Sequence, residues 1–318
     1  MRHLKTVVSQ EPAGTGHWNL DGVVKELRAV RERWRHAHDR QLDSGGREFP
    51  SREAVREVVA NLCGALFPMR LGPADLQQES EDFYIGHTLD VALRELLDQA
   101  RLELRCSGRA ESVGDGIDEK SIGILRDFAA GLPLIRELLD TDVEAAYKGD
   151  PAARSVDEVV LCYPGLTAII HHRLAHSLYR LGLPLLARMI AELAHSASGI
   201  DIHPGAEIGR SFFIDHGTGV VIGETAVIGD RVRLYQAVTL GAKRFPAGEE
   251  GELKKGLPRH PVVEDDVVVY AGATILGRIT IGRGSVIGGN VWVTQSVPPS
   301  SHVTQAISQH ALADLPDA

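Results

Sequence analysis

The stretch that decides the fold runs from residue 200 to residue 240 and reads IDIHPGAEIGRSFFIDHGTGVVIGETAVIGDRVRLYQAVTL. Every sixth residue in it, counted from Ile202 to Val238, is aliphatic or small. The same period returns after a polar interruption, from Val263 to Val293. A helix needs apolar residues at mixed spacings of three and four and a strand needs alternation, so a period of six fits neither alone. It is typical of a left-handed parallel β-helix, in which the chain turns a corner every six residues.

The chain before this stretch has the spacing of amphipathic helices. Apolar residues recur at intervals of three and four among Lys, Arg and Glu, as in residues 21–34 and 51–67. Pro133 predicts a break that divides residues 117–147 into two helices, whereas residues 159–181 are expected to form one. The predicted fold class is therefore α+β, an all-α N-terminal domain followed by a left-handed parallel β-helix of hexapeptide repeats.

Four parts are expected along the chain. They are a loose N-terminus over residues 1–20, a helical domain over 21–198, a β-helix catalytic domain over 199–299 with an extruded loop over 241–260, and a C-terminal tail over 300–318. A loop that leaves a regular repeat over such a length is usually functional. Glycines that follow an aliphatic residue, such as Gly209 and Gly229, are expected to turn tight corners at positive φ.

Composition excludes several classes of partner. The 318 residues carry a net charge of −9, which argues against a nucleic-acid or anionic-membrane surface. No run approaches the ~20 apolar residues of a membrane span, and residues 1–10 hold no apolar signal core, so we expect a cytoplasmic protein. Cys63, Cys106 and Cys162 are odd in number and form no CxxC pair, which predicts reduced thiols.

His216 is the first candidate for chemistry, because it interrupts the repeat between small residues that leave room around it. Imidazole is the side chain best matched to proton transfer near neutral pH, so we interpret His216 as a general base, against the alternative of a surface histidine. Asp201 lies earlier in the repeat, and stacking of coils is expected to bring its carboxylate to the ring N–H of His216. This contact would fix the tautomer of the imidazole and raise its basicity.

A second group of candidates consists of charged residues that suit a zwitterionic ligand. Arg259 ends the extruded loop and can hold a carboxylate through two charge-assisted hydrogen bonds, with His260 beside it. Asp150 and Asp215 can accept hydrogen bonds from an ammonium group. Each of these residues alone would be read as a solvated surface charge.

A metal site is not expected. Some hexapeptide-repeat enzymes are zinc carbonic anhydrases, which resemble one another in an HxxxxH pair that His203, His216 and His260 do not form. The helical trio His171, His172 and His176 has an i, i+4 pair but lacks the glutamate of HExxH.

The motifs resemble those of the serine O-acetyltransferases, in the bacterial subgroup with an extended N-terminal helical region. The resemblance covers about residues 138–299 and is carried by these stretches: Asp150-Pro151-Ala152, Tyr163-Pro164-Gly165, His172-Arg173-Leu174-Ala175-His176, residues 199–206, residues 213–225, Val238-Thr239-Leu240-Gly241 and Arg259-His260-Pro261. Generic hexapeptide acyltransferases share the period but not this set of motifs.

The resemblance implies roles for individual residues. His216 and Asp201 match the catalytic dyad, Asp150 and Asp215 the positions that bind the serine amino group, and Arg259 with His260 the positions at its carboxylate. Contacts to acetyl-CoA would fall near Gly241, Ala242, Ala271 and Gly289. The family has a second glycine after the first of these, where this chain has Ala242, and the loop that follows is longer here.

The resemblance also implies partners and regulation. The reaction would transfer acetyl from the co-substrate acetyl-CoA to L-serine, giving O-acetyl-L-serine and CoA in cysteine biosynthesis, without a metal. Family members form trimers or dimers of trimers, with the site shared between two copies, and many are inhibited by cysteine. Many also dock on cysteine synthase through a C-terminal isoleucine. This chain ends in Leu315-Pro316-Asp317-Ala318, so such docking is not expected.

Two other functions compete with this reading. One is acetyl transfer to another small hydroxyl or amine, such as a sugar, although two aspartates and Arg259 favour an amino acid. The other is a catalytically silent β-helix that serves as an assembly scaffold, against which the presence of both Asp201 and His216 argues.

Overall fold

The computed structural model describes residues 20–38, 49–106, 115–243 and 256–305. The chain divides into two compact units, residues 1–47 and 48–318. The described part of the first unit is α1 (Leu20–Ala37), an amphipathic helix without buried residues. Its apolar side chains are about half exposed: Val23, Val24, Leu27, Val30 and Trp34. The predicted loose N-terminus lies, except for Leu20, outside the described residues.

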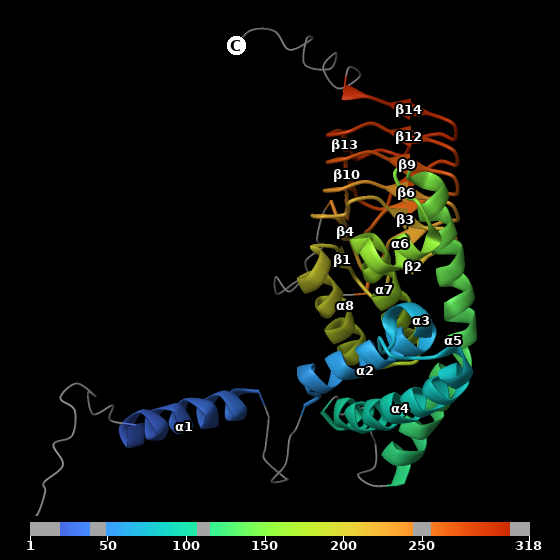
Figure 1. Cartoon of the computed structure of the whole chain (residues 1–318). Coiled ribbons are helices and arrows are strands. Elements are labelled where there is room, and N and C mark those ends of the chain that lie inside the picture. Colours follow the sequence, from blue (N-terminus) through green and yellow to red (C-terminus); the bar gives the residue numbers. More distant parts are fainter. Residues whose placement is uncertain (1–19, 39–48, 107–114, 244–255, 306–318) are drawn as a thin grey trace, which may run out of the picture. The chain divides into compact units, whose positions relative to one another are not determined.

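Helices form the first part of the second unit (Figure 1). α7 packs along α8, and α2 packs along α4. None of the helices in the described ranges is long and apolar enough to cross a membrane. Their bounds are α2 (Arg52–Leu66), α3 (Pro68–Leu71), the 3-10 helix η1 (Gln78–Ser80), α4 (Glu81–Cys106), α5 (Asp115–Gly149), α6 (Val156–Cys162), α7 (Pro164–Arg180) and α8 (Pro184–Ser198).

Two expected helix boundaries are wrong. α5 continues through Pro133 as one helix, because residues on both sides of the proline, Phe128, Leu132, Ile135 and Leu139, are buried in the same core. That burial outweighs the cost of about 3 kcal/mol for a proline inside a helix. Residues 159–181 are divided between α6 and α7, because Pro164 excludes the helical region at Tyr163, whose ψ is 116°.

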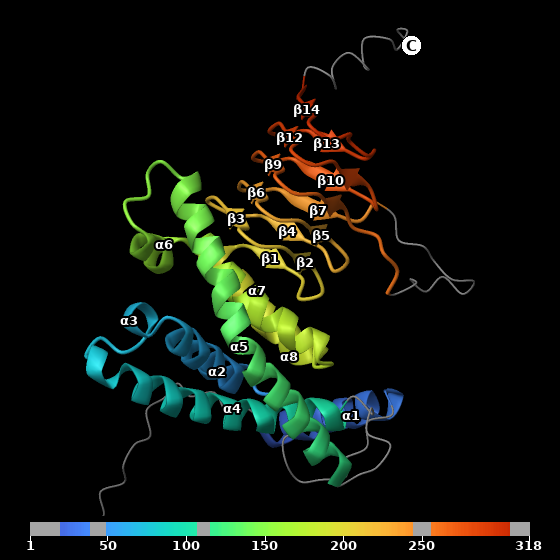
Figure 2. The ribbon, with the colours of Figure 1, turned by 90° about the vertical axis from the view of Figure 1, so that its right-hand side faces the viewer.

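The β-helix consists of three parallel sheets that we name A, B and C (Figure 2). Sheet A contains β1 (Asp201–Ile202), β4 (Val221–Ile222), β7 (Thr239–Gly241), β10 (Thr274–Leu276) and β13 (Trp292–Val293). Sheet B contains β2 (Glu207–Ile208), β5 (Val227–Ile228), β8 (Val262–Val263) and β11 (Thr280–Ile281). Sheet C contains β3 (Phe213–Ile214), β6 (Arg233–Leu234), β9 (Val268–Val269), β12 (Val286–Ile287) and β14 (His302–Val303).

The turns between these sheets are the A–B, B–C and C–A corners. Each strand pairs in register with the strand one coil away, as Ile202 pairs with Ile222 and Ile222 with Leu240. The strand residues that point inward are almost completely buried, which confirms the apolar period. β14 adds a strand to sheet C within the predicted tail, whose remainder, residues 306–318, lies outside the described part of the chain.

The expected role of the glycines in Ile-Gly pairs is wrong. None of Gly209, Gly223, Gly229, Gly282 and Gly288 has positive φ. They allow coils to approach closely: a Cβ at Gly209 would lie 2.7 Å from the carbonyl of Gly229, and one at Gly288 would lie 2.8 Å from the Val303 oxygen. Positive φ occurs at other corner positions, many of them without glycine, such as Ser211, Arg231 and Asp266. Backbone hydrogen bonds between coils hold these residues, as in Arg231 N–H to the Arg210 oxygen.

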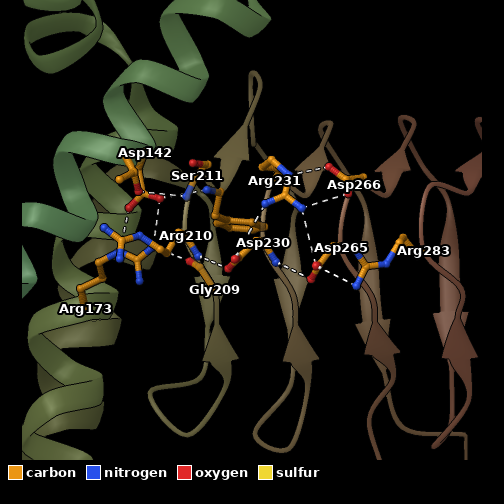
Figure 3. Close-up of polar contacts among 12 residues, drawn as sticks. Asp142, Arg173, Gly209, Arg210, Ser211, Asp230, Arg231, Asp265, Asp266 and Arg283 are labelled. Atoms are coloured by element: carbon orange, nitrogen blue, oxygen red, sulfur yellow. Dashed lines mark hydrogen bonds and ion pairs between the residues drawn. The ribbon is translucent and has the colours of Figure 1, made fainter.

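A network of charges along the B–C corners joins the helices to the β-helix (Figure 3). Arg173 of α7 makes two hydrogen bonds to Asp142 of α5, at 2.7 and 2.9 Å, and donates to the Gly209 carbonyl at 2.8 Å. Asp142 also accepts the Phe212 N–H at 2.9 Å, so the pair binds both ends of the first B–C corner. Further along, Arg231 bonds to Asp266 through two nitrogens, and Arg283 pairs with Asp265.

Replacement of Arg173 should destabilise the second unit strongly. The side chains of Arg173 and Asp142 are 5% and 1% exposed, so Arg173→Met leaves a buried carboxylate without its counter-ion. We expect a loss of about 3–5 kcal/mol in the free energy of unfolding, measured by urea denaturation. Arg94→Met is the control, because Arg94 makes an exposed ion pair with Asp90, and its urea midpoint should stay close to that of the wild type. Equal midpoints for the two variants would contradict this assignment.

Candidate active site

His216 lies in a C–A corner that is longer than the other C–A corners. The corner between β3 and β4 holds six residues, 215–220, whereas the next, between β6 and β7, holds four, 235–238. The apolar period hides this insertion, because inward positions pass from the strand residue Ile214 to the corner residue Val220 without a change of spacing. His216 has φ 61°, and its side chain is 70% exposed. The longer corner therefore carries the imidazole out of the coil.

Asp215 and Asp150 lie on the same side of the molecule as His216. Oδ1 of Asp215 is 3.8 Å from Nε2 of His216, and its Oδ2 accepts a hydrogen bond of 2.6 Å from Arg233. Asp150 follows the last residue of α5 and accepts hydrogen bonds from the Tyr163 hydroxyl at 2.5 Å and the Ala152 N–H at 2.8 Å. We call Asp150, Asp215, His216 and their partners Tyr163 and Arg233 the first half-site.

Electrostatics keep the first half-site anionic. The hydrogen bond from Tyr163 lowers the pKa of Asp150, with further contributions from the Ala152 N–H and the charges of Arg233 and His216. The same hydrogen bond raises the pKa of Tyr163 above its usual value, so the phenol remains a donor. Two carboxylates and an arginine therefore surround a region open to solvent beside His216, which is an arrangement suited to an ammonium group.

Asp201 does not make the expected contact within one chain. The register pairs Asp201 with Val221, which lies beyond the inserted corner, and the imidazole of His216 makes no hydrogen bond to it in the described residues. Burial, and then the charge of Arg188, lower the pKa of His203 to about 4, and the charge of Asp201 opposes this shift. Stacking of successive coils therefore does not form this dyad in the isolated chain.

Arg259 and His260 lie at the A–B corner, where the extruded loop returns to the repeat before β8. Nη2 of Arg259 donates to Glu224 at 2.6 Å, and Glu224 also accepts from the Tyr179 hydroxyl at 3.2 Å. Residues 244–255 of the loop lie outside the described ranges. We call Arg259, His260 and their neighbours Glu224, Tyr179 and Thr225 the second half-site.

The surroundings of His260 determine its tautomer. Nδ1 accepts the Thr225 N–H at 3.0 Å, which assigns the proton of the neutral ring to Nε2. A Cβ at Gly223 would overlap the ring, so only glycine fits there. Burial, and then the charge of Arg259, lower the pKa of His260 to about 4. A neutral His260 can therefore donate a hydrogen bond from Nε2 at pH 7.

The residues expected near acetyl-CoA divide between the same two corners. Ala271 and Gly289 lie on adjacent coils of the C–A corner, where the Ala271 carbonyl accepts the Asn290 N–H at 2.9 Å. Gly241 ends β7 and Ala242 starts the A–B loop, across sheet A from the first pair. The structure therefore brings Ala271 and Gly289 together but does not bring them to Gly241 within one chain.

Several residues of the two half-sites were not predicted as site residues. Tyr163 and Glu224 stood in the quoted motifs, but only the fold shows that they bond to Asp150 and Arg259. Arg233 gave no signal, because a charged residue at an outward-facing strand position is ordinary in a β-helix. No cluster of three or more His, Cys, Asp or Glu in the described residues is arranged to hold a metal ion.

Comparison with known proteins identifies the family. Residues 260–295 match the family model described as bacterial transferase hexapeptide (six repeats). A serine acetyltransferase of Synechococcus elongatus, described as plasmid, is 55% identical over 293 residues, which cover 91% of each chain. The chain belongs to the serine acetyltransferase family.

Solved serine acetyltransferases have the same fold. Serine acetyltransferase 1 of Entamoeba histolytica, in complex with L-cysteine, has a TM-score of 0.67 at 37% identity, over 78% of this chain and 86% of that one. The enzyme of Neisseria gonorrhoeae, in complex with serine, has a TM-score of 0.51 at 27% identity, over 79% and 94%. The fold class predicted for this chain, helices followed by a left-handed parallel β-helix, is confirmed.

The low pKa of His260 predicts a loss of stability in mild acid. A histidine with a folded pKa of about 4 and an ordinary value of 6.5 binds a proton more readily when unfolded. The contribution of the neutral His260 to stability is therefore fully present above about pH 6.5. The free energy of unfolding should fall as the pH is lowered from there toward about 4.

Urea midpoints between pH 7 and pH 5 test this prediction. His260→Gln should reduce the decrease, because glutamine cannot take up the proton. His302→Gln, at an exposed position of β14, is the matched control and should retain the whole decrease. A decrease in His260→Gln as large as in the wild type would contradict the prediction.

Proposed function

We propose that this chain transfers the acetyl group of acetyl-CoA to the hydroxyl of L-serine at a site formed by two half-sites from neighbouring copies. The observation that carries the proposal is the division of the site residues between two corners. The first half-site has the base and the carboxylates for an ammonium group, and the second has Arg259 for a carboxylate. Together they match the two charges of an amino-acid zwitterion.

The mechanism is direct transfer. His216 removes the proton from the serine hydroxyl, and the oxygen attacks the thioester carbonyl of acetyl-CoA. The tetrahedral intermediate collapses with cleavage of the carbon–sulfur bond, and the proton on the imidazole passes to the sulfur of the leaving CoA. An acyl-enzyme is not needed. Burial raises the pKa of the Cys63 thiol to about 12, and Cys63 belongs to α2 in the helical part, so it does not serve as a nucleophile.

Assembly as a closed trimer would complete the site. In a threefold arrangement the C–A corner of one copy faces the A–B corner of the next, and every interface is equivalent. Ala271 and Gly289 of one copy and Gly241 with Ala242 of the next would then line one groove for acetyl-CoA. We propose that assembly and substrate binding also bring an Asp201 carboxylate to the imidazole. A dimer of trimers would require further contacts through the helices.

Cysteine is the proposed inhibitor, because it has the same two charged groups as serine and lacks the hydroxyl. The Entamoeba relative was solved with L-cysteine and the Neisseria relative with serine, and both ligands suit a site of this charge pattern. Binding of cysteine would exclude serine by competition.

Release of CoA thiol from acetyl-CoA tests the reaction. We expect release that depends on L-serine and is inhibited competitively by L-cysteine, with no comparable rate for sugars or without an acceptor. His216→Ala should lower kcat by about 10²–10⁴-fold, the range for loss of a general base. Serine-independent release, or a near-normal rate in an assembled His216→Ala variant, would contradict the proposal.

Co-expression of two inactive variants tests whether the site is shared. His216→Ala and Arg259→Ala damage different half-sites, so a mixed trimer contains an interface at which both residues are intact. Random mixing of equal amounts should restore about a quarter of the wild-type activity, because about one interface in four combines the two intact corners. Each variant alone is the control. An inactive mixture that contains mixed trimers would show that both residues must come from one copy.

A further inference from the structure

We infer that Arg233 is a positioning residue for the ammonium-binding half-site, where it fixes the Asp215 carboxylate to the end of α5 and leaves one net negative charge. The inference rests on the proposed function and deepens it. Nothing in the motifs that carry the family resemblance includes this residue. The role of Arg233 is inferred from two hydrogen bonds that its guanidinium donates, one to Asp215 and one to Gly149.

Arg233 joins two segments that are far apart in the sequence. It lies in β6, one coil above β3, in register with Phe213. Nη2 donates to Oδ2 of Asp215 at 2.6 Å, and Nη1 donates to the carbonyl of Gly149 at 2.6 Å. Gly149 is the last residue of α5, and the next residue is Asp150. The guanidinium therefore sets the separation between the two carboxylates of the half-site, directly for Asp215 and through the backbone for Asp150.

Aromatic rings hold the guanidinium in place. Its central carbon lies 5.0 Å from the ring centroid of Phe213 and 4.6 Å from that of Tyr235. Tyr235 stacks in turn on Tyr270, with centroids 5.0 Å apart and ring planes 11° from parallel. The side chain of Arg233 is only 23% exposed. A guanidinium that contacts two rings and is mostly shielded from water has few rotamers available. Its two hydrogen bonds are therefore held in a fixed geometry.

The approach of α5 to the β-helix is built for this contact. A Cβ at Gly149 would lie 2.9 Å from the Phe213 ring and 3.6 Å from Nη1 of Arg233, so glycine lets the helix end come within hydrogen-bond distance. The last carbonyls of a helix carry partial negative charge, which a cation stabilises. Arg233 therefore donates a hydrogen bond to the last carbonyl of α5 and places a positive charge between that carbonyl and the Asp215 carboxylate.

Charge balance gives Arg233 a second effect. Asp150 and Asp215 in their ionised forms would place two negative charges around a substrate group that carries one positive charge. With Arg233 paired to Asp215, the half-site keeps one net negative charge. That charge matches a single ammonium, and it also reduces repulsion between the carboxylates before the substrate binds.

Replacement of Arg233 by methionine tests the inference, because methionine removes the charge and both hydrogen bonds but still occupies the space of the arginine side chain. A cavity of about 780 Å³ adjoins Arg233, Gly149 and Phe213, so a small residue would open the half-site to it. Arg233→Met should lower kcat/KM for L-serine by about 10–100-fold, the range for lost hydrogen bonds to charged groups, mostly through KM. KM for acetyl-CoA should stay within about twofold. Arg231→Met is the matched control, because Arg231 pairs with Asp266 at the B–C corner, at the other end of β6. The kinetics of this variant with L-serine should be those of the wild type.

A double-mutant cycle distinguishes positioning from packing. If Arg233 acts mainly through Asp215, Arg233→Met should change kcat/KM for serine by less than about threefold in an Asp215→Asn background, where only its contact with Gly149 before Asp150 remains. Arg233→Lys keeps the charge but cannot reach both acceptors in the same fork geometry, so it should recover only part of the loss.

The outcomes separate this inference from the proposed function. Serine-dependent activity in the wild type establishes the function first. Wild-type kinetics in Arg233→Met, or an undiminished effect of this change in the Asp215→Asn background, would then overturn the inference alone. If Arg233→Met does not assemble, Arg233→Lys decides, and an unchanged KM for serine in that variant would overturn the inference.

Discussion

Parallel pairing of each strand with the strand one coil away is the constraint on which this molecule depends. The pairing places equivalent residues of successive coils above one another, so the residues of a corner form a column along the β-helix. The B–C corners carry paired charges, and the C–A corners carry His216, the tyrosine stack and Ala271. Because coils approach within contact distance at Gly209 and Gly288, the columns have little freedom to shift, and side chains attached to them are held accurately.

The helices contribute to the site through the same constraint. The buried pair of Arg173 and Asp142 binds the first B–C corner, and α5 then runs to the C–A side, where Gly149 meets Arg233. Asp150, which belongs to the helical part of the sequence, is thereby placed beside Asp215 and His216. The candidate active site therefore lies where the helical part meets the β-helix, and both parts hold Asp150 and Asp215 in fixed positions.

Much of the site was visible in the sequence as chemistry but not as geometry. His216, Asp215 and Arg259 could be chosen because imidazole, carboxylate and guanidinium suit the reaction. The separation of His216 from Arg259, and of Asp201 from His216, could not be predicted, because it depends on which corner each residue occupies. Two inserted residues before Val220 leave the period of six intact while they change the corner, so the pattern alone could not reveal them.

The sequence by itself determined the fold class and the family, and it supplied His216 as the candidate base. A period of six dictates a β-helix because only that coil buries every sixth residue, and motif residues such as Asp215-His216 are read without coordinates. Only the tertiary structure decided that the Ile-Gly glycines serve close packing, that α5 passes Pro133 and that Arg233 joins Asp215 to Gly149. Those outcomes depend on contacts between segments distant in the chain, and local patterns carry no information about which distant segment arrives there.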